Sequence, residues 1–299
     1  MSLLVVGSVA YDSVKTPYGR MDEALGGSAL YFSLAASFFC PVKLVAVVGK
    51  DFKKKDIRFL NKRGINTEGL EIRQGKTFRW KGEYACDLNN RTTIYTHLNV
   101  LKDFKPELPP DYRNAPYVFL ANIDPDLQLS VLKQIKKPKL TACDTMNLWI
   151  ENKKKSLLKL LKSIDIFIVN DEEAREITGN FNLIKSGQQL LRLGPKMVII
   201  KKGEHGALVF GPKFKFWAPA YPLEEVYDPT GSGDAFAGGF MGYLAREKKL
   251  NKASFKKAVI YGSIIASYNV ESFSINRLKK ISRQDIEKRL AEFKELTSF

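Results

Sequence analysis

The chain alternates between short apolar runs rich in β-branched residues and longer segments whose apolar residues recur with helical spacing. The apolar runs predict buried strands at Leu3–Gly7, Val42–Val48, Tyr117–Ala121, Leu140–Cys143, Ile166–Val169, Met197–Lys201 and Ala207–Phe210. The periodic segments predict helices at Ala29–Phe39, Lys53–Arg63, Leu127–Ile135, Lys154–Ser163, Asp171–Thr178, Ile184–Leu193, Asp234–Arg246, Lys252–Ala266 and Arg283–Phe293. This alternation indicates an α/β fold: a doubly wound, mainly parallel sheet with helices on both faces. Such sheets bind ligands beyond the carboxyl ends of their strands.

Two segments depart from the alternation. Residues 71–100 place Phe78, Trp80, Tyr84 and a run of β-formers among polar residues, which is typical of antiparallel strands. Residues 12–25 are expected to add a strand or two. The chain shows no internal repeat, low-complexity stretch or obvious linker. We therefore expect residues 1–299 to form one domain.

Composition narrows the class of protein. The 299 residues are 44% hydrophobic and 27% charged, which suits a globular chain with a substantial core. No apolar run approaches the ~20 residues needed to cross a bilayer, so no membrane association is expected. The apolar start lacks a basic region and predicts a strand rather than a signal peptide. Cys40, Cys86 and Cys143 are widely spaced, which argues against disulfides or structural zinc and favours a cytoplasmic protein.

The formal charge is +16, from 48 basic and 32 acidic residues, so nucleic-acid binding must be weighed. The basic residues are spread over segments with helical periodicity, and no segment combines a basic stripe with interleaved aromatic residues. We therefore expect no nucleic-acid partner. A positive field would also attract a polyphosphate nucleotide.

The most informative stretch is residues 228–240, Asp-Pro-Thr-Gly-Ser-Gly-Asp-Ala-Phe-Ala-Gly-Gly-Phe. Gly231 and Gly233 flank Ser232, so the backbone can turn sharply and present its N–H groups. The residues that follow predict a helix, and free N–H groups at a helix start form an anion site. Asp234 stands beside that site, where a carboxylate can take a proton from an alcohol that attacks phosphate. The alternative is that Asp234 only caps the helix.

This stretch resembles the C-terminal signature of the ribokinase-like (PfkB) family of carbohydrate and nucleoside kinases. The resemblance implies that Gly231, Ser232 and Gly233 form the anion hole and that Asp234 is the catalytic base. It also implies a small β lid, contributed here by about residues 12–25 and 71–100.

The resemblance extends to the substrate side. Asp12 follows the first strand, where the family has an aspartate that binds substrate hydroxyls; the alternative is a solvated turn residue. Gly26 and Gly27 are similar to the family's N-terminal Gly-Gly signature and would lie against the substrate. Tyr31 stands where sugar kinases usually carry an asparagine, a departure that leaves the substrate open. Asn122 and Asp144 follow strands and would face the cleft, with Asn122 as a substrate contact, and Arg91 in the lid would meet a substrate, a phosphate or only solvent.

On the nucleotide side, Asn170 and Glu173 match the family's Asn-x-x-Glu motif, which organises Mg²⁺ and its waters. Their spacing also fits a capping box. The resemblance places Lys202, Gly203 and Asn269 near the nucleotide. Asp228 and Thr230 stand where some relatives bind a monovalent cation. The expected cofactors are therefore ATP and Mg²⁺, and whether K⁺ is bound in addition is left open.

Other enzyme classes are not supported. The chain has no Walker P-loop and no GxGxxG after the first strand, and His97 and His205 are its only histidines. We predict an ATP-dependent kinase that transfers the γ-phosphoryl group to a hydroxyl of a sugar or polyol, as a monomer or a homodimer through the lid. The alternatives are a nucleoside kinase of the same family, a non-catalytic sugar- or nucleotide-binding protein, and a basic nucleic-acid-binding protein.

Overall fold

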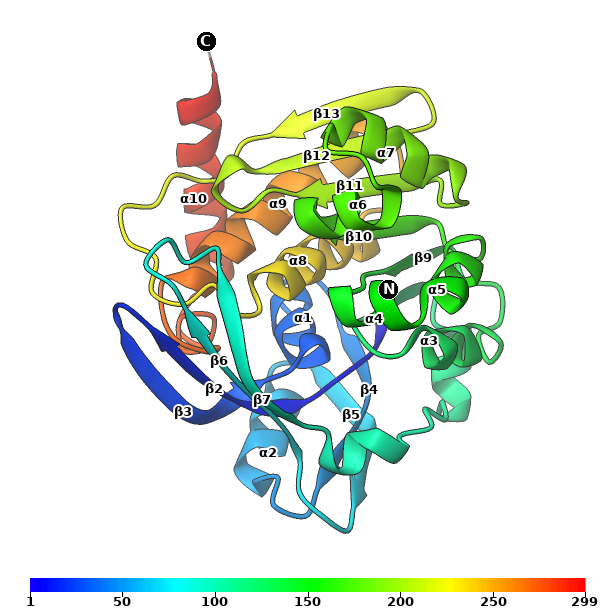
Figure 1. Cartoon of the computed structure of the whole chain (residues 1–299), viewed down its shortest axis with the longest axis vertical. Helices are drawn as coiled ribbons and strands as arrows, with labels where there is room; N and C mark the ends of the chain where they lie inside the picture. Colours follow the sequence, from blue (N-terminus) through cyan, green and yellow to red (C-terminus); the bar gives the residue numbers. More distant parts are fainter. Residues whose placement is uncertain (299) are drawn as a thin grey trace.

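The computed structural model describes residues 1–298, which form one large and one small sheet (Figure 1). The large sheet has nine strands in the order β13-β12-β11-β10-β9-β8-β1-β4-β5. Its strands are β1 (Leu3–Val6), β4 (Val42–Gly49), β5 (Ile65–Arg73), β8 (Tyr117–Leu120), β9 (Leu140–Cys143), β10 (Ile166–Asn170), β11 (Met197–Lys201), β12 (Ala207–Gly211) and β13 (Phe214–Ala218). Only β12 and β13 run antiparallel to their neighbours.

Two apolar cores cover the two faces of this sheet. Alternate residues of β1 point to opposite sides: Leu3 and Val5 belong to one core, Leu4 and Val6 to the other. The first core packs under α1 (Ser28–Ala36), α8 (Ser232–Arg246) and α9 (Lys252–Val270), with contributions from α2 (Lys54–Lys62) and α10 (Arg283–Thr297). The second packs under α3 (Pro125–Leu132), α4 (Asn147–Asn152), α5 (Lys154–Leu161), α6 (Asp171–Thr178) and α7 (Leu183–Arg192). The predicted doubly wound α/β fold is confirmed.

The small sheet, which we call the lid, lies to one side of the large sheet (Figure 1). Its order is β3-β2-β6-β7, from β2 (Ala10–Thr16), β3 (Gly19–Gly26), β6 (Phe78–Tyr84) and β7 (Arg91–His97). The two hairpins are antiparallel, and β2 joins them by pairing parallel with β6. The predicted segment 71–100 began too early, because Glu71–Arg73 complete β5 in the large sheet.

Two strands and one α-helix of the described residues were absent from the sequence prediction, as were three short 3-10 helices. The strand β5 reads Ile-Asn-Thr-Glu-Gly-Leu-Glu-Ile-Arg and lies at the edge of the sheet, so its polar residues meet solvent and mask the apolar signal. The other edge strand, β13, alternates Phe-Lys-Phe-Trp for the same reason. The helix α4 has six residues, too few for a periodic pattern. Within the described residues, no helix is long and apolar enough to span a membrane.

Candidate active site

The candidate site lies at the carboxyl ends of the central parallel strands, where β9, β10 and β11 end side by side. Asp144 follows β9, Asn170 ends β10 and Lys201 ends β11. Asn170 and Lys201 are direct partners in the parallel ladder, so they end their strands at the same level. The helices α8 and α6 begin at this edge, and each brings an acidic residue in its first turn. Strand ends thus gather polar groups from segments far apart in sequence.

The glycine loop, residues 228–233, leads into α8 as the sequence predicted. Gly231 is the N-cap residue and has φ 72°, a left-handed conformation that favours glycine. A Cβ at Gly231 would also overlap the ring of Tyr31. No side chain caps the helix start. The Ser232 N–H donates to the Pro229 carbonyl at 3.1 Å, and the N–H groups of Gly231 and Gly233 are left for water or a ligand.

Asp234 lies in the first turn of α8 and is half-buried. Burial raises the pKa of its carboxyl to about 6, and the positive charges of Lys201 and Arg91 oppose that rise. Its side chain makes no capping hydrogen bond to α8. A half-buried carboxylate with a raised pKa beside free N–H groups at a helix start is suited to accept a proton near neutral pH.

Two further carboxyl groups complete what we call the acidic cluster, defined as Asp144, Glu173 and Asp234. Asp144 is buried, its Oδ1 has no hydrogen-bond partner among the described residues, and burial together with the charge of Asp234 raises its pKa well above the usual range. Burial raises the pKa of Glu173 to about 7, against the pull of Lys201. The cluster is costly to keep charged, which is typical of functional sites.

The capping box at α6 is present. The Asn170 side chain accepts from the Glu173 N–H at 2.7 Å, and Glu173 Oε2 accepts from the Asn170 N–H at 2.8 Å. Within residues 1–298 no group of three His, Cys, Asp or Glu side chains stands close enough to enclose a metal ion. The side-chain oxygens of Asn170 and Glu173 are donors of the kind that a hard cation such as Mg²⁺ takes, together with waters and phosphate oxygens.

On the acceptor side, Asp12 is buried in the lid strand β2 beside the two glycines that precede α1. The Gly27 N–H donates to Asp12 Oδ2 at 3.3 Å, and a Cβ at Gly26 would overlap the same carboxylate. Burial raises the pKa of Asp12 to about 7, and the negative charges of Asp228 and Asp234 add to the rise. The structure thus brings Asp12, Gly26 and Gly27 together and holds their carboxylate and backbone near Asp234.

Two candidate substrate contacts are engaged elsewhere. Tyr31 is 1% exposed and packs on Gly231, with its hydroxyl buried and without a partner among the described residues. Asn122 accepts from Trp149 Nε1 at 2.8 Å and points its amide nitrogen at the Met146 sulfur, 3.1 Å away. The geometry makes Tyr31 a support for the glycine loop and ties Asn122 to α4.

The candidate cation ligands brace the glycine loop. Asp228 accepts from the Thr230 N–H at 2.9 Å and the Ser274 N–H at 3.0 Å, so each carboxylate oxygen has a backbone partner. Thr230 donates its hydroxyl to Tyr84 in the lid at 3.1 Å. Asn269, expected near the nucleotide, is fully buried in α9 and donates to the Thr230 carbonyl at 2.9 Å. Asn269 therefore positions the glycine loop through Thr230.

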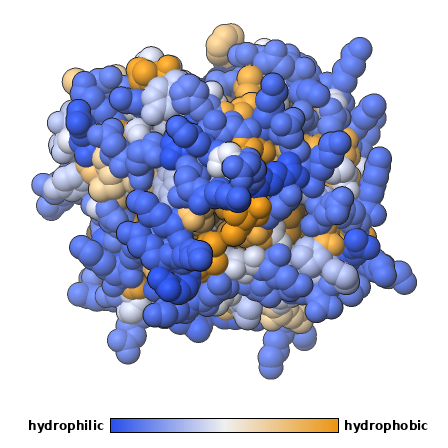
Figure 2. All heavy atoms as spheres, turned by 90° about the horizontal axis from the view of Figure 1, so that it is seen from below, coloured by the Kyte–Doolittle hydropathy of each residue, from blue (hydrophilic) through white to orange (hydrophobic). Residues whose placement is uncertain are grey.

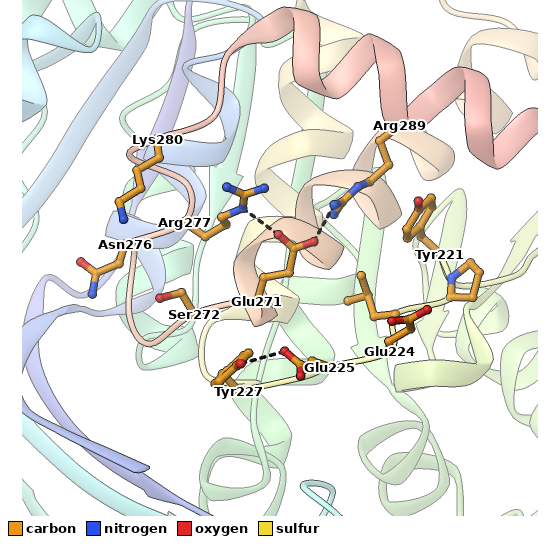
Figure 3. Close-up of a pocket in the computed structure, with 12 residues that line it drawn as sticks. Tyr221, Glu224, Glu225, Tyr227, Glu271, Ser272, Asn276, Arg277, Lys280 and Arg289 are labelled. Carbon is orange, nitrogen blue, oxygen red and sulfur yellow. Dashed lines mark hydrogen bonds and ion pairs between the residues drawn. The ribbon is translucent and has the colours of Figure 1, made fainter. Parts of the chain in front are cut away.

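Lys202 and Gly203 form the turn between β11 and β12. The Lys202 N–H bonds to the Gly206 carbonyl, and Gly203 is exposed. A cavity of about 610 Å³ lies elsewhere, beside the segment 221–227 and the end of α9 (Figure 3). Its central feature is Glu271, bound by Arg277 and Arg289. No member of the acidic cluster lines this cavity, and Tyr227, which precedes the glycine loop, does.

Sequence reasoning missed one residue of the site and gave another no role. Lys201 reads as half of a Lys-Lys pair at a strand end, and Asp144 was placed at the cleft without a function. Both gain their place from the sheet order, which puts β9, β10 and β11 together. The lid adds Trp80, the direct partner of Asp12 in the β2–β6 ladder.

Comparison with known proteins identifies the class. Residues 2–279 match the model of the pfkB family of carbohydrate kinases. The chain belongs to this family and is a phosphotransferase that acts on hydroxyl groups. The predicted family and enzyme class are confirmed.

Individual relatives share most of the chain. It is 31% identical to a cytidine kinase of Thermococcus kodakarensis over 84% of this chain and 91% of that protein. It is 25% identical to a nucleoside kinase of Methanocaldococcus jannaschii over 77% and 73% of the two chains. The crystal structure of a Methanocaldococcus jannaschii nucleoside kinase superposes with a TM-score of 0.80, covering 97% and 98% of the chains at 21% identity. A putative Ribokinase II from E. coli, in complex with ATP and Mg²⁺, gives a TM-score of 0.80 over 97% and 99% at 16% identity.

Proposed function

We propose that the protein is an ATP-dependent nucleoside kinase. The observation that carries the choice of acceptor is the 31% identity to a cytidine kinase over 84% of the chain. The sequence alone favoured a sugar or polyol and kept a nucleoside as the alternative. The similarity to a cytidine kinase and a nucleoside kinase now favours the alternative. A sugar acceptor remains the second candidate because the matching family model is named for carbohydrate kinases.

In the proposed reaction Asp234 removes the proton from a primary hydroxyl of the acceptor. That oxygen attacks the γ-phosphorus of ATP, the bond from the γ-phosphorus to the β,γ-bridging oxygen breaks, and ADP leaves with the bond's electron pair. The N–H groups of Gly231, Ser232 and Gly233 stabilise charge on the transferred phosphoryl group. Mg²⁺, when bound, would neutralise the phosphates, held through water by Asn170 and Glu173. Positioning by the loop and the lid supplies much of the acceleration.

The lid supports a nucleoside acceptor through Trp80. Trp80 and Asp12 are paired on neighbouring strands and face the same side of the lid. The Trp80 indole lies flat over Gly82, where any Cβ would overlap it, and its Nε1 donates to Thr93 at 3.3 Å. The Arg91 guanidinium lies over this ring, 5.3 Å from its centroid, and a base would stack on the half-buried indole in its place while Asp12 binds sugar hydroxyls.

An acceptor screen tests the proposal. Phosphoryl transfer from ATP is measured by product chromatography with cytidine, uridine and the purine nucleosides, and in parallel with ribose, fructose and inositols. A nucleoside should be the best acceptor by kcat/KM. Activity confined to free sugars would overturn the proposal in favour of a sugar kinase.

Variants at Trp80 sharpen the test. Trp80→Ala should raise the KM for the nucleoside roughly 10-fold, the loss of about 1–3 kcal/mol of stacking. Trp80→Phe should retain most of the affinity, and the KM for ATP should stay constant in both. If Trp80→Ala leaves the nucleoside KM unchanged, the base does not stack on the lid.

A further inference from the structure

The ammonium group of Lys201 is a cation without a partner. Lys201 is half-buried at the end of β11, in register with Asn170. Within the described part of the chain its Nζ makes no hydrogen bond and no ion pair, although Asp144, Glu173 and Asp234 are near enough for its charge to lower the pKa of all three. A lysine that served only as a counter-ion would bind one of these carboxylates directly.

The ammonium instead lies against the start of α8. Its Nζ is 2.5 Å from the point where a Cβ on Gly233 would stand. Gly233 has no left-handed φ, so the backbone does not demand a glycine there. A glycine within a helix costs about 0.5–1 kcal/mol relative to alanine. The missing side chain leaves room for the Lys201 ammonium beside the helix N–H groups, and an alanine at this position would push the ammonium aside.

An anion at this place would meet two sources of positive charge. The N–H groups of Gly231 and Gly233, which have no partner among the described residues, approach from the helix start, and the ammonium approaches from the sheet edge. Asp234, the proposed base, stands in the same helical turn. The group that must lie between the base and the loop during transfer is the γ-phosphoryl of the nucleotide.

We propose that Lys201 is a catalytic residue that binds the γ-phosphoryl group of ATP and stabilises its charge during transfer. This inference rests on the proposed kinase reaction but does not depend on which acceptor is used. The ammonium and the loop N–H groups form one anion site, and Gly233 is small so that both can reach the same oxygens.

Nucleotide binding tests the role without any acceptor. Affinities for Mg²⁺-bound AMP-PNP and Mg²⁺-bound ADP are measured by calorimetry, and their ratio reports the γ-phosphoryl contacts. Lys201→Met should reduce the AMP-PNP affinity roughly 10- to 100-fold while the ADP affinity changes little. With the best acceptor, kcat should fall roughly 10²- to 10³-fold, as for other transition-state donors, and the acceptor KM should stay constant.

Two further variants give the controls. Lys213→Met removes an exposed lysine from the turn between β12 and β13, at the opposite end of these strands, and should leave the ratio and kcat unchanged. Gly233→Ala keeps the loop N–H group but places a methyl group against the ammonium, so it should lower the ratio in the same direction as Lys201→Met. Because both changes remove one interaction, the double variant should be little worse than Lys201→Met alone.

The inference is overturned if Lys201→Met lowers the melting temperature but leaves the AMP-PNP to ADP ratio intact, since Lys201 would then only offset the acidic cluster. Additive effects of Lys201→Met and Gly233→Ala would also overturn it. The two proposals can fail separately. If no nucleoside is phosphorylated but Lys201→Met still loses the preference for AMP-PNP over ADP, the choice of acceptor is wrong and the role of Lys201 is supported.

Discussion

The chemistry of the site depends on how Asp234 is held at the start of α8. Burial disfavours its charged form, while Lys201 and Arg91 restore part of the lost stability. The result is a carboxylate that is ionised at neutral pH yet basic enough to accept a proton.

We predict that Asp234→Asn lowers kcat roughly 10²- to 10⁴-fold, because the amide has the same shape but cannot take the proton. Binding of ADP, measured by calorimetry, should change little. Steady-state kinetics with the best acceptor checks the first outcome. Turnover at the wild-type rate would mean that Asp234 has only a structural role in α8.

The pH dependence follows from the same burial. Asp234, with a pKa of about 6, and Asp12, with a pKa of about 7, are both needed as carboxylates in the proposed reaction. We expect kcat/KM for the acceptor to be level above pH 8 and to fall with more than first-order slope as the pH drops through 7 and 6. In Asp12→Asn only one of the two carboxyl groups still titrates, so the slope of log(kcat/KM) against pH should fall by one. A profile that is level down to pH 5 would contradict the assignment.

At the residue scale, the sequence predicted what a contiguous motif can carry. The glycine loop, Asp234 and the Gly-Gly pair next to Asp12 are each written in one short stretch. Lys201 could not be recognised in this way, because its significance lies in the 2.5 Å approach to the Cβ position of Gly233, 32 residues later in the chain. Tyr31 stays a predicted substrate contact, and the structure adds a packing role that its position in the sequence did not indicate, because its ring lies against Gly231.

At the scale of elements, three strands of the lid are hydrogen-bonded to the glycine loop or to residues beside it. Tyr84 of β6 accepts from Thr230, Thr16 of β2 donates to the Tyr227 carbonyl, and the carbonyl of Leu25 in β3 accepts from Ser274. A movement of the lid therefore pulls on both sides of Asp228. This arrangement joins the side that would hold the acceptor to the side that would hold the phosphate.

The helix α6 offers a test of two overlapping roles for Glu173. Its carboxylate closes the capping box, and the proposed reaction also assigns it to the waters of Mg²⁺. Glu173→Gln preserves the hydrogen bond to the Asn170 N–H but removes the charge. We predict a several-fold higher Mg²⁺ concentration for half-maximal rate with little change in melting temperature.

The control for Glu173→Gln is a variant that removes only a helix cap. Asn182→Ala does so at the N-cap of α7, where the Asn182 side chain accepts from two backbone N–H groups. It should lower stability by about 1 kcal/mol without altering the Mg²⁺ requirement. If Glu173→Gln behaves like Asn182→Ala, the carboxylate of Glu173 is only a cap.

Element prediction succeeded where the local pattern agrees with the final environment. Strands buried on both faces, such as β1 and β10, are continuous apolar runs and were found within one residue. The edge strands β5 and β13 were missed because one side of each meets solvent. Strand order and the parallel pairing of β2 with β6 depend on contacts between distant segments, which no local pattern contains.

At the scale of the whole molecule, the surface is mostly hydrophilic, as Figure 2 shows from below, with an apolar area near the centre of that face. The chain carries a net charge of +16, whereas two members of the acidic cluster, Asp144 and Glu173, are buried and the third, Asp234, is half-buried. Buried carboxyl groups make the stability of the protein depend on pH, since folding changes their affinity for protons.

Asp144 should dominate this dependence, because its pKa in the folded protein is raised well above the ordinary value near 3.8. A raised folded pKa means that the folded state binds the proton more tightly than the unfolded state. The resulting stabilisation is fully present below the unfolded pKa and is lost as the pH rises toward the folded pKa.

Asp144→Asn keeps the shape and cannot ionise, so it should match the wild type near pH 4. It should raise the melting temperature at pH 8 by at least about 2–4 °C, the shift for 1 kcal/mol in a chain of this size. Calorimetric scans across this range check the prediction, with Asp126→Asn, a mostly exposed aspartate on α3, as the control that should show no such gain. A melting temperature lowered by Asp144→Asn at every pH would show instead that the charge of Asp144 stabilises the folded site through Lys201.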